Sequence, residues 1–222
     1  MMPGKFASTD EIISLFHDGQ TIMCGGFANH GVPNHLIQCV IDSGARHLTL
    51  IANDSGDADL TVGRLIHHGR VDKLIASHIG RNTETVALVA AGKIELELVP
   101  QGSLAERMRC GGSGLGGVLT KTGIGTMVDK GKPHIEVGGE IWLLETPLQA
   151  DIGLVRARTA DPLGNLTYRG TMRNFNPLVA KASRLTLVDA DMLVDVDELD
   201  IDSIITPGAY VDKILTMQGE RP

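Results

Sequence analysis

Short apolar runs alternate with helix-like segments along much of this sequence, and this alternation limits the possible folds more than any other feature. Four β-prone runs lie in the first hundred residues: Thr21–Cys24, Leu48–Ala52, Leu74–Ser77 and Ile94–Val99. Helical patterns follow three of the four. Because parallel strands need a crossover connection, which is usually a helix, the repeated strand and helix units predict a parallel sheet covered by helices.

The helices have recognisable ends. Ser8 and Glu11 have the spacing of a capping box before an apolar stretch, and Asp18-Gly19 supplies a stop, so a first helix is expected between them. Pro33 suits the first turn of a second helix. This second helix is predicted over about 33–44. Further helices are predicted near these residues: Glu84–Ala91, Leu104–Cys110 and Pro177–Ala182.

The sequence becomes glycine-rich and weakly periodic at about 111–145. Within it, Gly138-Gly139 separates two β-prone runs and predicts a hairpin with a two-residue turn. Strands resume afterwards: Asp151–Ala157, Leu166–Tyr168 and Leu185–Val188. We therefore predict a single domain over residues 1–222, an open three-layer α/β/α sandwich with a mostly parallel sheet and a small β-rich excursion.

Length and charge exclude several classes of protein. A chain of 222 residues is long enough for one sizeable core. Its net charge of −7 gives no basic footprint for nucleic acid or an anionic membrane. The N-terminus lacks a basic flank followed by an apolar stretch, and nowhere do about 18 apolar residues run together. We therefore expect a cytoplasmic protein that binds neither nucleic acid nor membrane.

Metal-binding patterns are missing from the sequence. Cys24, Cys39 and Cys110 are far apart and form no C-x-x-C pair, so we interpret them as reduced structural thiols. The histidines form no H-E-x-x-H motif, and no metal site is expected. The acidic residues from Asp189 to Asp202 lack the glycine and glutamate of a calcium loop and are interpreted as a solvated face.

The most informative segment runs from Asp18 to Pro33 and contains Gly25-Gly26 directly after the first predicted strand. A third glycine, Gly31, precedes the proline that begins a helix. Glycines in this position let the backbone approach a ligand and point N–H groups at an anion such as phosphate. The pattern is equally compatible with a tight turn between a strand and a helix that binds nothing.

This segment resembles the N-terminal signature of family I (3-oxoacid type) CoA-transferases: Asp-Gly, three apolar residues, Gly-Gly-Phe, three variable residues, then Gly-x-Pro. Other blocks similar to the A, or alpha, subunits of this family follow in order: Pro100–Arg107, Gly111–Gly114, Thr120–Thr126, Gly164–Tyr168, Arg173–Pro177 and Thr206–Gly208. Together the blocks span nearly the whole chain. The resemblance implies the three-layer fold of CoA-transferases and two homologous subunits.

The resemblance also implies a ping-pong exchange in which a glutamate attacks the acyl-CoA thioester and later carries CoA as an enzyme thioester. In two-chain members that glutamate lies in a Glu-Asn-Gly segment of the B, or beta, subunit, and this sequence contains no Glu-Asn-Gly. We therefore expect no catalytic nucleophile in this chain, activity only with a beta subunit, and an α2β2 assembly. CoA and acyl-CoA are expected as substrates, with no permanently bound cofactor.

Site residues follow from the same resemblance. The family's CoA-binding segment matches these residues: Gly25, Gly26, Phe27, Ala28, Asn29, His30 and Gly31. Gln101 matches a glutamine beside the thioester, where its amide can donate to the developing oxyanion. Asn53 offers a similar donor, or alternatively closes a strand through an Asx turn. We expect these residues in loops at the carboxyl ends of the strands.

Alternative assignments remain open. The blocks look closest to the acetate/butyrate–acetoacetate subgroup, with 3-oxoadipate and succinyl-CoA:3-oxoacid enzymes as alternatives. A nucleotide-dependent oxidoreductase that binds NAD and a CoA-binding scaffold without activity are the rival classes. Glu84, Glu106 and Glu145 are each open to a nucleophile role, although Glu106 more simply completes a capping box with Ser103.

Overall fold

A computed structural model describes residues 4–216 and confirms a mostly parallel sheet. In spatial order the strands are β1 (Phe6–Ala7), β12 (Lys213–Leu215), β11 (Ser183–Leu193), β9 (Ala150–Ala160), β2 (Thr21–Cys24), β3 (Leu48–Asp54), β4 (Val71–His78) and β5 (Glu95–Leu98). Every neighbouring pair along this path is parallel. A further short strand, β10 (Leu166–Thr167), pairs antiparallel with β9. The order reverses between β2 and β9.

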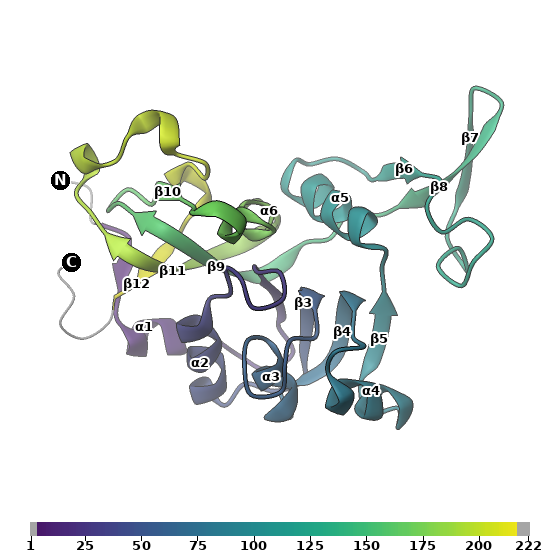
Figure 1. Cartoon of the computed structure of the whole chain (residues 1–222), viewed down its shortest axis with the longest axis horizontal. Helices are drawn as coiled ribbons and strands as arrows, with labels where there is room; N and C mark the ends of the chain where they lie inside the picture. Colours follow the sequence, from purple (N-terminus) through teal and green to yellow (C-terminus); the bar gives the residue numbers. More distant parts are fainter. Residues whose placement is uncertain (1–3, 217–222) are drawn as a thin grey trace.

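Helices cover both faces of this sheet (Figure 1). One face carries α1 (Thr9–Ile13), α2 (Asn34–Ser43), α3 (Gly63–His67) and α4 (Thr83–Ala90). The opposite face carries α5 (Gln101–Gly112) and α6 (Asn176–Ala182). Four short 3₁₀ helices lie in the C-terminal half: η1 (Gly170–Arg173), η2 (Val196–Glu198), η3 (Ile201–Ser203) and η4 (Gly208–Tyr210). The three layers predicted from the alternation of elements are therefore present.

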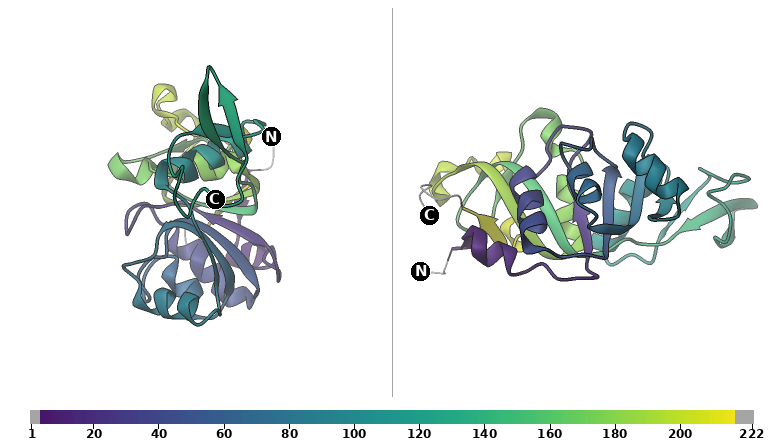
Figure 2. Two further views of the ribbon diagram at one scale, coloured as in Figure 1. Left: turned by 90° about the vertical axis from the view of Figure 1, so that its right-hand side faces the viewer. Right: turned by 90° about the horizontal axis from the view of Figure 1, so that it is seen from below.

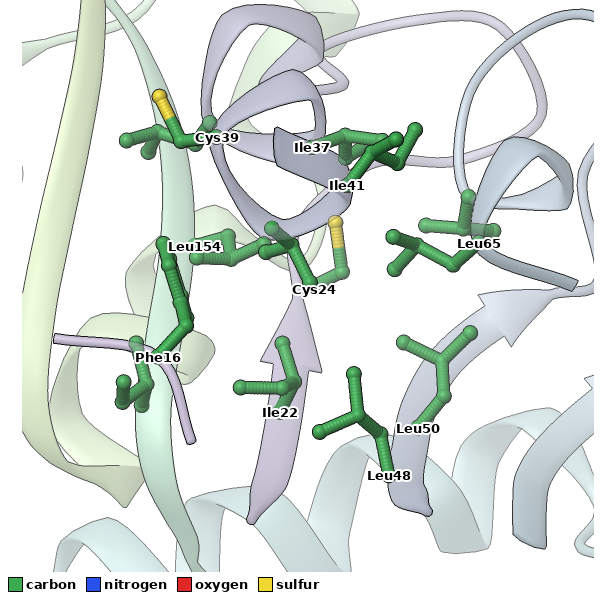
Figure 3. Packing of buried hydrophobic residues seen from close by; sticks show 14 of the residues in the cluster. Phe16, Ile22, Cys24, Ile37, Cys39, Ile41, Leu48, Leu50, Leu65 and Leu154 are labelled. Carbon is green, nitrogen blue, oxygen red and sulfur yellow. The ribbon is translucent and has the colours of Figure 1, made fainter. Parts of the chain in front are cut away.

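The core consists of two apolar clusters, one on each face of the sheet. Strand β2 contributes to both, because successive side chains of a strand point to opposite faces. Its Ile22 and Cys24 face α2, whereas Met23 belongs to the cluster under α5 and α6. Figure 3 shows Ile22 and Cys24 between Leu154 of β9 and Leu50 of β3, beneath the side chains of α2. Burial on both faces explains the uninterrupted apolar runs in the sequence.

The first helix begins as predicted and ends early. Ser8 and Glu11 form the expected capping box, but α1 ends at Ile13 instead of running to Asp18. Its last bonds span only three residues, so the chain leaves the helix through a tighter turn. The Asp18 carboxylate instead accepts a hydrogen bond from the Arg46 N–H at 2.7 Å. A tertiary contact therefore replaces the predicted continuation of the helix.

Strands β9 and β11 are longer than the sequence indicated, at 11 residues each. Charged residues near their ends are not typical of a buried strand. In the sheet, however, Arg156 of β9 pairs with Asp189 and Asp191 of β11, and Asp189 is only 3% exposed. The interpretation of this acidic stretch as a solvated face is therefore wrong for Asp189, because a cross-strand ion pair compensates its burial.

The predicted excursion is a separate antiparallel sheet of β6 (Val118–Thr120), β8 (Glu140–Glu145) and β7 (His134–Val137). We call residues 118–145 the arm. It projects beyond one end of the main sheet in Figure 1 and in the right-hand view of Figure 2. Gly138 and Gly139 form the expected turn, both with positive φ. The hairpin was therefore predicted correctly.

The excursion begins later than predicted, because Gly111 and Gly112 belong to helix α5. A Cβ atom on Gly111 would lie 1.9 Å from the carbonyl oxygen of Leu148, and one on Gly112 would lie 2.6 Å from Lys181. These two glycines therefore allow close packing of a helix. Among residues 4–216, no helix is long and apolar enough to cross a bilayer.

Candidate active site

A pocket of about 310 Å³ lies at the carboxyl ends of strands β2 to β5. Residues from four successive strand ends line it: Phe27, Ala28, Asn53, Asp54, Ser77, His78, Arg81 and Gln101. In an open parallel sheet this edge is where the connecting segments converge and where ligands bind. Asn53, Gln101 and part of the glycine-rich segment therefore meet at one place, as the sequence predicted.

Asn53 and Gln101 reach the pocket from regular elements and not from loops, which corrects the prediction. Asn53 belongs to strand β3 and is 6% exposed, and Gln101 is the first residue of helix α5. Gln101 Nε2 donates to Asn53 Oδ1 at 3.0 Å. A strand end and a helix start hold the two amides in place more firmly than loops would.

The Asx turn proposed for Asn53 is made by its neighbour. Asp54 Oδ1 accepts a hydrogen bond from the Gly56 N–H at 2.8 Å. The Asn53 side chain instead donates to Asp54 and accepts from Gln101 and, at 3.4 Å, from the Ser77 hydroxyl. Helix α5 also lacks the capping box proposed for Ser103 and Glu106. Its N-cap is Pro100, and Ser103 is buried within the helix. Glu106 instead pairs with Arg109 at 2.7 Å.

The glycine-rich segment forms a tight turn after β2. Phe27 and His30 exchange two backbone hydrogen bonds of 3.0 Å, and Ala28 between them adopts a φ of +50°. That left-handed conformation costs a residue with a Cβ atom about 1–2 kcal/mol. The Asp54 carboxylate accepts a hydrogen bond from the Ala28 N–H at 2.9 Å and so stabilises the turn.

Most N–H groups of this turn already have acceptors inside the protein. The amide of Gly25 bonds to Leu154 of β9, and that of Gly26 bonds to the side chain of Asn174 at 3.1 Å. Together with the bonds of Phe27, Ala28 and His30, five amides are occupied. The expectation of a row of free amides is therefore wrong at these positions. Among residues 4–216, the N–H groups of Asn29 and Gly31 have no acceptor.

The glycines themselves are required by packing. A Cβ atom on Gly25 would lie 1.9 Å from Asn176 Oδ1, and one on Gly26 would lie 2.6 Å from Val32. Gly31 has a φ of +65°, and a Cβ atom added to it would lie 2.8 Å from the carbonyl oxygen of Met172. The segments near residue 30 and residue 174 therefore pack tightly against each other. This packing accounts for the glycines of the Asp18–Pro33 segment and for the Arg173–Pro177 block without requiring a ligand.

A family model described as coenzyme A transferase matches residues 6–216. The chain belongs to the coenzyme A transferase family. This CoA-transferase chain is 51% identical over 217 residues to the acetate CoA-transferase subunit alpha of Escherichia coli K12, covering 98% of this chain and 99% of that protein. It is 44% identical to the acetoacetyl-CoA:acetate/butyrate CoA transferase alpha subunit of Clostridium acetobutylicum, over 96% and 98% of the two chains.

A solved structure shares the fold of this CoA-transferase chain. It is an Escherichia coli O157:H7 acyl-CoA transferase in a thioester complex with CoA, with a TM-score of 0.88 at 21% sequence identity. The match covers 99% of this chain and 48% of that one. The likeness therefore confirms the three-layer architecture, and the chain corresponds to about half of that longer protein.

The pocket of this CoA-transferase chain contains residues that the sequence analysis did not assign to the site: Asp54, Ser77, His78 and Arg81. Ser77 and His78 end strand β4, as Asn53 and Asp54 end β3. The signal in the sequence that could have identified these residues is that they directly follow an apolar run. Arg81 is more than half exposed and lies 3.7 Å from Asp57, whose carboxylate also accepts from Asn29. Arg81 therefore brings a positive charge to the rim of the pocket.

The other candidate nucleophiles lie outside this pocket. Glu84 pairs with His67, and the buried Glu145 pairs with Lys132 at 2.7 Å where the arm meets the body.

Burial raises the pKa of the Cys24 thiol far above its usual value, so the nucleophilic thiolate is suppressed there. Burial also raises the pKa of Cys39 to about 11. Among the described residues no group of three His, Cys, Asp or Glu could hold a metal.

A second pocket, of about 300 Å³, lies on the other side of the glycine turn, where the strand order reverses. It is lined by Asn29, Gly31, Val32, Asn34, His35, Arg156, Met172 and Asp191. Arg156 pairs with both Asp189 and Asp191, and His35 Nδ1 lies 3.1 Å from Asp189. The charges in this second pocket therefore largely compensate one another.

Proposed function

We propose that this chain is the alpha subunit of a heteromeric CoA-transferase that moves CoA between a short-chain acyl-CoA and a free carboxylate such as acetate, butyrate or acetoacetate. The observation that carries the proposal is the amide pair of Gln101 and Asn53 at the carboxyl edge of the sheet. It provides hydrogen-bond donation for an oxyanion. The names of the relatives in Escherichia coli and Clostridium acetobutylicum support the substrates.

The reaction needs a nucleophilic glutamate, which we assign to a beta subunit. Its carboxylate attacks the thioester carbonyl, and the CoA thiolate leaves to give an acyl-glutamyl anhydride. The thiolate then attacks the glutamyl carbonyl and releases the first carboxylic acid as its anion. A second carboxylate reverses these two steps and departs as a new acyl-CoA. Each addition places negative charge on a carbonyl oxygen, which is the charge that a Gln101 N–H can stabilise.

CoA is a substrate in this scheme and passes along the glycine turn at Gly25, Gly26, Phe27, Ala28, Asn29, His30 and Gly31. The N–H groups of Asn29 and Gly31 are the donors that the packed turn leaves for an anionic group. His30 lies within the same turn and can face the phosphates. Arg81 adds a positive charge nearby. Asn29 and Gly31 line the second pocket whereas Arg81 lines the first, so contact with CoA is expected on both sides of the turn.

The beta subunit completes the site, and we propose an α2β2 assembly. The arm supports association because it exposes large apolar side chains. Ile135, Val137 and Ile141 lie on its strands, and Ile124 and Met127 lie between β6 and β7. A small projecting sheet with such a surface is better stabilised by a partner than by water. We also propose that the chain folds as a single domain and acts in the cytoplasm.

The principal test is reconstitution. This chain and a homologous chain bearing Glu-Asn-Gly are expressed together, purified as a complex, and assayed with acetoacetyl-CoA and acetate. Formation of acetyl-CoA by the complex, and by neither chain alone, is expected. Transfer by this chain without a partner would refute the assignment of the nucleophile.

The same complex separates the alternatives. Faster turnover with 3-oxoadipate or succinyl-CoA than with acetate would favour those subgroups. A CoA-binding scaffold would bind CoA without transferring it. An NAD-dependent oxidoreductase would be stabilised by NAD in a thermal melt, whereas we expect stabilisation by CoA esters.

A further inference from the structure

The orientation of the catalytic amides depends on a residue that the reaction scheme does not use. The carboxylate of Asp54 accepts three hydrogen bonds: from Asn53 Nδ2 at 2.8 Å, from the Ala28 N–H at 2.9 Å and from the Gly56 N–H at 2.8 Å. An ionised carboxylate can only accept. The Asn53 group that faces it is therefore the NH₂, which leaves the Asn53 oxygen facing Gln101.

The same argument fixes Gln101. Asn53 Oδ1 can only accept, so the Gln101 group 3.0 Å away is the NH₂. One of its two hydrogens bonds to Asn53, and the other stays available for a reacting oxygen. If Asn53 were turned over, its NH₂ would face Gln101 and draw the Gln101 oxygen toward it. The pocket would then offer an acceptor where the reaction needs a donor.

We propose that Asp54 is a positioning residue that sets the Asn53 amide and, through it, keeps the Gln101 NH₂ directed at the thioester oxygen. This inference rests on the proposed CoA-transferase function. Asp54 also holds Ala28 in its left-handed conformation, so one carboxylate fixes both the glycine turn and the amide pair. Asp54 contacts neither the reacting carbon nor the nucleophile in this scheme.

The test uses steady-state kinetics of the reconstituted complex. Asp54→Ala removes the acceptor and leaves room for water, which bonds equally well to either orientation of Asn53. We expect kcat to fall on the order of 10-fold with KM for acyl-CoA changed by less than about 2-fold, because the donor acts on the transition state. Asp54→Asn keeps one acceptor oxygen, so kcat should recover to within about 3-fold of the parent value.

A double-mutant cycle with Gln101→Ala separates positioning from general damage. If Asp54 acts through Gln101, Asp54→Ala should lower kcat by less than about 2-fold once Gln101 is absent. Multiplicative losses would overturn the proposal, as would an unchanged kcat in Asp54→Ala or no recovery in Asp54→Asn. Asp72→Ala is the matched control, because Asp72 is exposed and pairs with His47 on the surface.

The outcomes distinguish the two proposals. A parent complex that transfers CoA, combined with multiplicative losses, overturns only the role of Asp54. A parent complex that transfers no CoA overturns the function itself. Asp54→Ser is the second variant if Asp54→Ala does not assemble with the beta chain. Failure of the Ala, Ser and Asn variants to assemble would make Asp54 a folding residue and overturn the proposal.

Discussion

The two pockets on either side of the glycine turn differ in how far their polar groups are already satisfied. Toward β9 and β11, Arg156 and Asp189 form a largely buried ion pair that His35 and Asp191 extend. Toward β3 and β5, the neutral amides of Asn53 and Gln101 bond to each other and keep a donor for a ligand. Each pocket is lined by one aspartate, one arginine and one histidine, so the difference is that the pocket toward β9 contains an ion-pair network and the pocket toward β3 contains a pair of neutral amides.

Residue type alone therefore does not locate a site. Buried opposite charges that pair with each other maintain the structure, since separating them is costly. A neutral amide in a preorganised position can stabilise a transition state, because its donor needs no rearrangement when charge develops. We therefore propose a structural role for the ion-paired pocket and a chemical role for the amide pocket.

Removing Arg156 should have the largest effect. Arg156→Met leaves Asp189 buried without its main cationic partner, and we expect the free energy of unfolding to fall by about 3–5 kcal/mol. Urea unfolding followed by circular dichroism measures it. Arg184→Met is the control, because the Arg184 side chain is 79% exposed and its ion pair with Asp151 is long, at 3.8 Å. A loss no larger than that of the control would contradict the structural role of this pocket.

Gln101→Ala should act on rate instead. Loss of one oxyanion donor typically lowers kcat about 100- to 1,000-fold, and KM for acyl-CoA should change little. Initial rates of the reconstituted complex test this, and a melting temperature near that of the parent shows that the fold is retained. An unchanged kcat would remove Gln101 from the mechanism and weaken the contrast between the pockets.

Gly25→Ala tests the turn that separates the pockets. The new methyl group would lie 1.9 Å from Asn176 Oδ1, whose oxygen also accepts from the Arg156 N–H at 2.8 Å. We expect a loss of about 1–3 kcal/mol in the free energy of unfolding, as for overpacking. Gly116→Ala is the matched change, because no atom of residues 4–216 lies within 4 Å of its added Cβ. Equal stability of the two variants would show that the loop adjusts freely.

Arg81→Gln should have the smallest effect. Arg81 is exposed at the rim, so its attraction for an anion is screened by water and is worth at most about 1 kcal/mol. We expect KM for acyl-CoA to rise by less than about 10-fold with kcat nearly unchanged. Lys73→Gln, at an exposed pair with Glu95, serves as the control. A rise in KM for free acetate alone would assign Arg81 to the carboxylate and not to the coenzyme.

Much of the fold could be predicted from sequence because its determinants are local. Strand β2 was predicted with its observed bounds, and the capping box at Ser8 and the Gly138-Gly139 turn were also correct. In each case the pattern depends on neighbouring residues whose periodicity or backbone preference is independent of the rest of the chain. Helix α3 and the paired terminal strands β1 and β12 were not predicted. They are short, and β1 and β12 depend on pairing across the whole chain.

The site was predicted in part. The resemblance pointed to Gln101, Asn53 and the glycine turn, and the structure brings Gln101, Asn53 and part of that turn to one pocket. Arg81 and His78 were not assigned, since only the parallel order of β3, β4 and β5 places the ends of these strands beside one another. The occupied amides of Gly25 and Gly26 could not be foreseen either. Their partners lie about 130 to 150 residues further along the chain.

Residue order is enough to establish the alternation of strands and helices, the family, and the lack of a Glu-Asn-Gly segment, because each is a pattern of neighbouring residues. Which polar groups remain available depends on the folded chain. Hydrogen bonds and ion pairs form between segments distant in sequence, such as Asn53 with Gln101 and Arg156 with Asp189. A residue can bind or polarise a ligand only with the donors, acceptors and charges that are not already used by partners within the protein.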